Sequence, residues 1–334
     1  MASFARTQEI SHEIGAGGRF SLRVTSSDVE LREVSGTAAR VRVEFDIRAS
    51  SEAEADETFE RAQFRVRKAD GLLEVAEPKR TELGGGSIAR LLGVGGKGEA
   101  RVVAELPAEA GLAYGGVSAD LMAIGLIGPQ QYTTVSGDLV LSEAAGAIRI
   151  SGVSGDISLR GVGPIALKAN TVSGDISAFA PRLEETRLVT VSGDIELEGS
   201  LADGGDHRME TVSGDLSLGA VDGLTLEVRG LSTDVHVSVP HRSEGSRDRR
   251  RYVIGEGGPG VVFSSMSGDV SVGPARRFES GRFDVPAPPR APAPPTPPPP
   301  LDEEAQLAIL RALEAGEIDV DEATRRLSGS RTDG

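Results

Sequence analysis

A short motif, Ser-Gly-Asp, recurs in the chain and constrains its fold more than any other feature. Two degenerate copies, Ser118-Ala-Asp120 and Ser232-Thr-Asp234, accompany six full ones. The full copies are Ser136–Asp138, Ser154–Asp156, Ser173–Asp175, Ser192–Asp194, Ser213–Asp215 and Ser267–Asp269. Successive serines from Ser118 lie 18, 18, 19, 19, 21, 19 and 35 residues apart, so one irregular turn is expected between 234 and 267. A repeat of this length is typical of a solenoid, because a single repeat cannot bury its own inner face.

The residues around each motif alternate as in a β-strand. In the copy at Ser173, alternation predicts Val172, Gly174 and Ile176 on the inner face. The residues expected to face outward are Thr171, Ser173, Asp175 and Ser177. The same parity assigns to the inner face Val191, Ile195, Leu197, Val212, Leu216 and Leu218. Turn residues and second apolar runs separate these strands, so we expect an all-β fold, a parallel β-helix of about eight rungs.

Composition supports a thin, stacked core. Hydrophobic residues make up 38% of the chain, but only 4% of residues are aromatic and Trp is absent, so Val, Ile, Leu and Ala must fill the interior. The net charge of -15 argues against a nucleic-acid partner, because binding to phosphates needs a basic surface. The absence of Cys excludes disulfides and thiolate metal sites.

Shifts in composition predict four segments. Residues 1–106 are expected to form a β-rich cap with one short helix at 51–64, N-capped by Ser51, and 107–284 the β-solenoid. The run VPAPPRAPAPPTPPPP at 285–300 predicts a polyproline II linker. Residues 301–334 predict a small α-helical hairpin, which is too short for a core of its own. We therefore expect it to bind a protein partner or to self-associate.

The sequence shows no segment that would place the chain in a membrane. The first ten residues lack an apolar core like that of a signal peptide, and no stretch approaches the roughly 20 apolar residues of a transmembrane helix. We expect no transmembrane segment and a cytoplasmic location.

Several segments resemble a bacterial family of putative adhesins whose domain, of unknown function, consists of β-strand repeats. The resemblance rests on the Thr-Val-Ser-Gly-Asp-Ile strands, on Val103-Ala-Glu-Leu-Pro107 and on the region from Gly257 to Asp269, and covers roughly residues 10 to 275. It implies a right-handed parallel β-helix and, from some relatives, a link to envelope stress. The segment from Ile309 to Ala323 looks like a short helical module that accompanies such domains.

Stacked rungs would align one aspartate per repeat. This column comprises Asp138, Asp156, Asp175, Asp194 and Asp215. Like charges about 4.8 Å apart cost on the order of 1 kcal/mol each in water, so something must offset the repulsion. The carboxylates could cap turns through backbone N–H groups, hold a ladder of Ca²⁺ ions, or form part of a ligand-reading face of Thr, Ser and Asp rows. No other cofactor is expected.

Other polar groups give weaker indications of a binding or catalytic site. The basic run containing Arg247, Arg249, Arg250 and Arg251 is a candidate site for phosphate or an acidic partner, or simply a solvated loop. The histidines are scattered at 12, 207, 236 and 241, and every Asp of the column has the same surroundings, so no catalytic group is singled out.

These features favour a non-enzymatic binding or scaffold protein. One alternative is a cytoskeletal polymer like the bactofilins, whose small β-helices join end to end. A folded cap at residues 1–106 would disfavour such joining. Another alternative is a carbohydrate-active enzyme, which would need acids clustered in a cleft and usually aromatic platforms, whereas this chain has three Tyr and no Trp.

Overall fold

The computed structural model describes residues 2–78, 99–246 and 249–275. These residues belong to one compact unit, Met1–Arg277. The predicted linker at 285–300 and the predicted helices at 301–334 lie outside the described residues.

The first part of the unit contains seven strands and a helix. They are β1 (Ala2–Glu13), β2 (Arg19–Arg23), β3 (Asp28–Val34), β4 (Ala38–Ala49), α1 (Glu52–Ala62), β5 (Arg65–Ala69), β6 (Leu72–Ala76) and β7 (Glu99–Pro107). The helix begins as its sequence predicts, because the side chain of Ser51 accepts a hydrogen bond from the Glu54 backbone N–H. Phe59 of α1 packs edge-on against Phe45 of β4, with the ring centroids 5.3 Å apart.

The repeats form the next group of strands. They are β8 (Gly111–Ser118), β9 (Leu121–Ile124), β10 (Gln130–Ser136), β11 (Leu139–Ser151), β12 (Ile157–Asn170), β13 (Ile176–Val189), β14 (Ile195–Leu201), β15 (His207–Glu210) and β16 (Leu216–Ala220). The last group comprises β17 (Leu224–Ser232), β18 (Val235–Val237), β19 (His241–Ser246), β20 (Arg249–Ile254), β21 (Gly260–Ser267) and β22 (Val270–Pro274).

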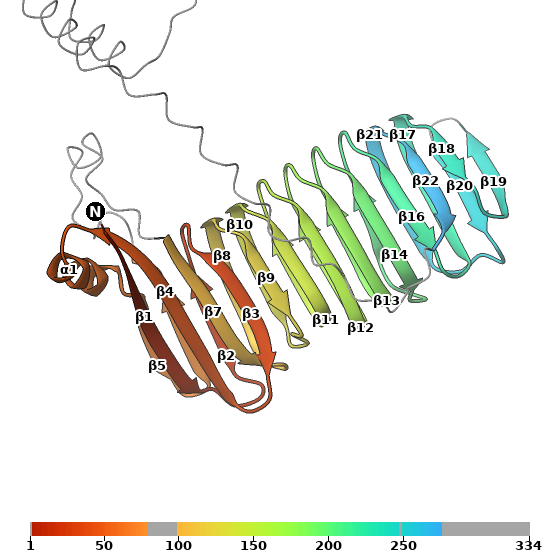
Figure 1. Ribbon diagram of the computed structural model, residues 1–334. Coiled ribbons are helices and arrows are strands. Elements are labelled where there is room, and N and C mark those ends of the chain that lie inside the picture. The colour runs from red at the N-terminus through yellow and green to blue at the C-terminus, as the bar shows by residue number, and fades with distance from the viewer. Residues whose placement is uncertain (1, 79–98, 247–248, 276–334) are drawn as a thin grey trace, which may run out of the picture. The chain divides into compact units, whose positions relative to one another are not determined.

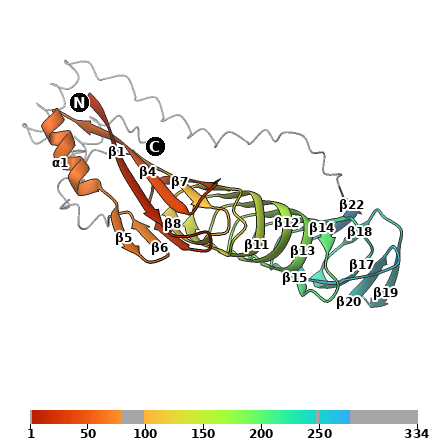
Figure 2. The same ribbon diagram turned by 90° about the horizontal axis from the view of Figure 1, so that it is seen from below.

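Within the described residues these strands form two layers that face each other across the core (Figures 1 and 2). The first layer has the order β5-β6-β2-β8-β10-β11-β12-β13-β15-β21-β17-β20-β19. The second has the order β1-β4-β7-β3-β9-β11-β12-β13-β14-β16-β22-β18. The strands β11, β12 and β13 belong to both layers, because each bends at a register shift and continues on the other side.

The C-terminal rungs are not stacked in chain order. After β16 the chain builds the outermost rung from β17 and β18, and then the antiparallel hairpin β19–β20. It returns through β21 and β22, which insert between the rung of β15 and β16 and the rung of β17 and β18. The long spacing of 35 residues before Ser267 is thus a hairpin followed by an inserted rung.

The N-terminal rungs follow a similar scheme. The strands β2 and β3 lie between the rung of β6 and β7 and the rung of β8 and β9. Antiparallel strands then cover the end, with β5 on β6, and β4 and β1 beyond β7. Antiparallel strands therefore close both layers at the N-terminal end. At the C-terminal end they close the first layer, whereas the second layer ends at the short parallel strand β18.

These pairings overturn the predicted fold, a right-handed parallel β-helix with a C-terminal α-helical hairpin. The sheet is mixed, because terminal rungs of a parallel stack would leave unpaired backbone groups, which the antiparallel strands cover. In the described part of the chain the single helix is α1, and it precedes the repeats. The predicted fold class, with its C-terminal helical hairpin, is therefore corrected to a mixed β-sheet with one N-terminal helix.

Candidate functional site

Each Ser-Gly-Asp motif forms a tight corner between the two layers. In one rung, β12 ends at Asn170, the corner spans residues 171–175, and β13 begins at Ile176 in the other layer. The corner needs glycine because Gly174 has φ +130° and a Cβ there would overlap the carbonyl of Gly155 in the preceding rung. We call these segments the Ser-Gly-Asp corners.

The aspartates of the corners form a continuous hydrogen-bonded ladder. One carboxylate oxygen of each Asp accepts the backbone N–H of the Asp in the next rung, for example Asp194 N to Asp175 Oδ1 at 2.8 Å. The same bond, at 2.7 to 3.2 Å, joins in spatial order Asp120, Asp138, Asp156, Asp175, Asp194, Asp215, Asp269 and Asp234. The order at the end reflects the inserted rung. Each carboxylate caps a backbone donor that the corner leaves unpaired, which offsets repulsion along the column.

The ladder leaves limited capacity for a cation. One oxygen of each predicted ligand is already engaged with a backbone N–H, whereas Ca²⁺ needs six to eight oxygen ligands. Over the ranges that the structure describes, no group of three or more His, Cys, Asp or Glu side chains is arranged to hold a metal ion. The geometry therefore favours the capping role for this column.

A substitution pair separates capping from cation binding. Asp175→Asn keeps an acceptor oxygen, so we expect the free energy of unfolding to stay within about 0.5 kcal/mol of wild type, whereas Asp175→Ala should lower it by about 1 to 2 kcal/mol. Urea unfolding with and without calcium chloride measures both. A calcium-dependent stabilisation that Asp175→Asn abolishes would show that the ladder holds cations.

The valines that precede the motif serine are exposed, contrary to the predicted inner face. Val172 is 49% exposed and Val191 is 45% exposed, whereas Thr171 and Thr190, expected to face outward, are buried. Ile176, Ile195, Leu197, Leu216 and Leu218 are buried as predicted. The alternation fails because the backbone turns at the corner between Thr171 and Asp175. The Thr side chain therefore faces the core and the Val side chain faces outward.

Seven such apolar residues stand in line, and we call them the corner row. It comprises Val117, Val135, Val153, Val172, Val191, Val212 and Met266. The backbone fixes the row from Val135 to Met266. The motif serines Ser154, Ser173, Ser192, Ser213 and Ser267 each donate their N–H to a carbonyl of the row in the preceding rung, as Ser192 does to Val172 at 2.9 Å. The motif serines also pair as parallel bridges from Ser136 through Ser267. Sequence alternation assigns three residues of this row, Val172, Val191 and Val212, to the core, and the structure corrects that assignment.

Behind the corner row lies a buried column of hydroxyl groups. The hydroxyls of Thr134, Thr190, Thr211 and Ser265 are buried and have no hydrogen-bond partner among the described residues. The hydroxyl of Thr171, in contrast, donates to the carbonyl of Ser173 at 3.3 Å. Since an unpaired buried hydroxyl costs free energy, we expect Thr190→Val to raise the free energy of unfolding by about 1 kcal/mol. Thr171→Val is the matched control and should bring no gain. Thermal unfolding of the two variants measures this, and equal effects would contradict it.

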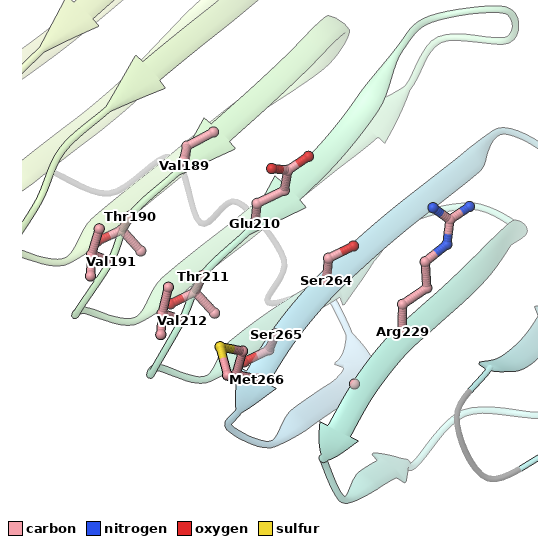
Figure 3. Close-up of a pocket in the computed structure, with 11 residues that line it drawn as sticks. Val189, Thr190, Val191, Glu210, Thr211, Val212, Arg229, Ser264, Ser265 and Met266 are labelled. Carbon is pink, nitrogen blue, oxygen red and sulfur yellow. The ribbon is translucent and has the colours of Figure 1, made fainter.

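An open hollow of about 450 Å³ lies beside the C-terminal part of the corner row. Figure 3 shows Val191, Val212 and Met266 at successive corners, with Glu210 and Arg229 on strands beside them. The hollow lies where β21 is inserted between β15 and β17, which are closer to each other in the sequence than either is to β21. The repeat alone does not predict this insertion, so it could not locate the hollow.

The arginines of the predicted basic run are largely occupied. Arg247 lies outside the described residues. Arg249 contacts Glu227 at 2.6 Å, and hydrogen bonds from Arg249 and Arg229 hold the pKa of the Glu227 carboxyl below its usual range. Arg250 donates to the carbonyl of Thr233 at 2.6 Å and so ties β20 to the corner of the outermost rung. Arg251 is exposed and pairs in register with Glu227 and Glu244.

The histidines do not come together. His207 is buried, with its ring nitrogens 3.1 Å from the carbonyl of Ala202 and 3.4 Å from the hydroxyl of Thr186. His12 and His241 lie against backbone carbonyls at 2.7 and 2.9 Å, and His236 is exposed on β18. His236 follows Asp234 of the ladder by two residues, but the described residues hold no cluster of three or more His, Cys, Asp or Glu around it that could bind a metal ion.

The arrangement of repeated strands agrees with one known family. The family model described as Toastrack DUF4097 matches residues 16–189 and, in a second alignment, 131–273. The chain belongs to the Toastrack DUF4097 family. Its two matches overlap over 131–189, as expected where a repeat aligns in more than one register. No curated protein matches this Toastrack chain.

Several solved structures are similar to the Toastrack chain. A "putative lipid binding protein" from Parabacteroides distasonis has 10% identity and a TM-score of 0.38, with 80% of this chain and 96% of that chain covered. A "putative adhesin" from Bacteroides fragilis has 10% identity and a TM-score of 0.31, over 80% and 97%. A "putative cell adhesion protein" from Clostridium sporogenes has 10% identity and a TM-score of 0.24, over 80% and 99%.

Among the residues with described positions, none of the helices has the length and apolar character needed to cross a membrane. The cytoplasmic location and the absence of a nucleic-acid partner stay predictions.

Proposed function

We propose that this Toastrack protein is a non-enzymatic binding or scaffold protein. The observation that carries the proposal is the repetition of equivalent corners, each of which presents the same apolar, hydroxyl and carboxylate groups in rows. Catalysis needs a few groups that differ from their neighbours in burial, charge or geometry. Rows of equal side chains suit the binding of a long partner instead, as in other solenoids.

The adhesin-like relatives and the family resemblance extend the proposal to the cell envelope and its stress response. The binding role would then be to hold a partner during envelope damage. Deletion of the gene in the producing bacterium should lower survival under an antibiotic that blocks cell-wall synthesis, with restoration by the wild-type gene. Unchanged survival would remove the envelope role and leave the binding role in place.

The edge strands at the two ends count against a bactofilin-like polymer. The edge strand β5 is exposed and carries Arg65, Arg67 and Lys68, and such charges oppose strand addition by another molecule. At the other end the first layer is covered by β19, whose described side chains are exposed and polar. The second layer ends at β18, which has only three residues, and so short an edge strand is a poor template for strand addition. Light scattering of the full chain should therefore give a discrete molar mass rather than a polydisperse distribution.

The enzymatic alternative is tested by incubating the full chain with peptidoglycan and with a panel of bacterial polysaccharides. We expect no release of reducing ends. An activity that is lost in Asp175→Asn would overturn the proposed function, because that substitution keeps the acceptor of the ladder and removes only the acid.

A further inference from the structure

The corner row contains most of the exposed large hydrophobic side chains of the described residues. In the described residues, eleven large hydrophobic side chains are exposed. Seven of them belong to this single row, and their exposed fractions range from 43% to 57%. Scattered exposed apolar residues need no explanation, but a contiguous line of them marks a contact surface. With six rung steps of about 4.8 Å, the row is about 29 Å long.

A row of carboxylates runs beside the corner row. Each acidic residue follows its apolar neighbour by three positions, as Asp175 follows Val172, and the ladder residues from Asp156 to Asp269 are exposed. One oxygen of each carboxylate caps the next rung, and the described residues provide no hydrogen-bond donor for the second oxygen. The surface thus combines an apolar line with a parallel line of acceptors.

We propose that the corner row and the aspartate ladder together bind an extended, basic segment of another protein, with an apolar side chain at every third position and Lys or Arg between. This inference rests on the proposed binding function and specifies its site and partner class. The apolar residues of the segment cover the valines, and its cations reach the free carboxylate oxygens.

The spacing of the rungs selects the conformation of the partner. A polyproline II segment repeats every three residues, or about 9.3 Å, which is close to two rung steps of about 9.6 Å. An α-helix advances about 10.8 Å in two turns, which is longer than two rung steps. Its side chains would therefore lose register with the corner row within a few rungs. An extended segment of this kind also loses little conformational entropy on binding, since it is already elongated.

The hollow at the C-terminal part of the row provides for a larger side chain. Its wall includes Val212 and Met266 of the row (Figure 3). Glu210 and Arg229 also line it, and each is already paired, Glu210 with Arg208 at 3.6 Å and Arg229 with Glu227 at 2.6 Å. The apolar wall therefore suits a large apolar side chain of the segment at this end of the row.

Charge counts against two other occupants of the row. A second copy would bring two aspartate ladders together along a shared face, and these would repel. An anionic lipid surface would be repelled by the same ladder and by the net charge of -15.

The test uses the full chain and a fluorescently labelled peptide of five Val-Pro-Lys repeats, with anisotropy as the readout. We expect saturable binding that weakens at least about tenfold in the triple variant Val153→Ser, Val172→Ser, Val191→Ser. The matched control is Val162→Ser with Val221→Ser, which alters valines that are 61% and 49% exposed but outside the row. It should change the affinity less than about twofold.

Charge is tested separately with Asp156→Asn, Asp175→Asn and Asp194→Asn combined, which preserves the capping oxygens. This variant should bind the peptide more weakly and with less dependence on salt, and a Val-Pro-Glu peptide should not bind. Unfolding curves show that each variant is folded.

Four outcomes would overturn the inference. The first two are peptide binding that the row variant leaves unchanged and no peptide binding at all. The others are a dimer that light scattering shows to be disrupted by the row variant, and row-dependent binding to phosphatidylglycerol vesicles in place of the peptide. None of them is confused with failure of the proposed function, which would show as enzymatic activity on a polysaccharide.

Discussion

The substitution Gly174→Ala is expected to lower the free energy of unfolding by about 3 kcal/mol or more. Two costs combine at this corner. At φ +130° a side chain strains the backbone, and the new Cβ would overlap the carbonyl of Gly155, which is itself part of the preceding corner. Because that carbonyl belongs to backbone that cannot move without disturbing its own rung, the overlap cannot be relieved by a rotamer change.

Two other glycines separate these costs. Gly204 has φ +76° but no atom within 4 Å of an added Cβ, so Gly204→Ala should cost about 1 kcal/mol through backbone strain alone. Gly260 has neither a positive φ nor a neighbour within 4 Å, and Gly260→Ala should be nearly neutral. Chemical unfolding of the three variants gives the comparison. An equal effect at 174 and 204 would contradict the close stacking of the corners.

The second large effect concerns which apolar residue of the repeat supports the core. Ile195 is 1% exposed, and Ile195→Ala should lower the free energy of unfolding by about 3 to 4 kcal/mol, because it leaves a cavity between stacked rungs. Val191 lies four residues earlier and is 45% exposed. The substitution Val191→Ala should therefore lower the free energy of unfolding by less than about 1 kcal/mol.

The contrast between these two positions is measured by urea unfolding at one temperature. If Val191→Ala proves as destabilising as Ile195→Ala, then the valine is in the core and the corner row does not exist as a surface. A small effect at both positions would instead mean that neighbouring rungs fill the space at 195.

The repeat determined much of the protein without any structure. Its period implies stacked β-rungs, the motif residues Asp175 and Asp194 recur in equivalent places, and Ser51 starts the helix that its spacing predicts. The burial of Ile176, Ile195 and Leu216 also follows from the sequence, because these residues lie inside strands where side chains alternate with a period of two.

Only the tertiary structure decided what happens where the strands end. Alternation cannot be carried through a corner, so Val172 and Thr171 exchange their predicted sides. For the same reason Val191 and Val212 are exposed although their parity predicts the core. A local sequence pattern does not predict the order of the rungs either. The strands β21 and β22 carry the last motif, yet they pair on both sides with strands that precede them in the chain. Backbone hydrogen bonds between distant segments set that order, and the sequence period is the same whichever rung is placed outermost.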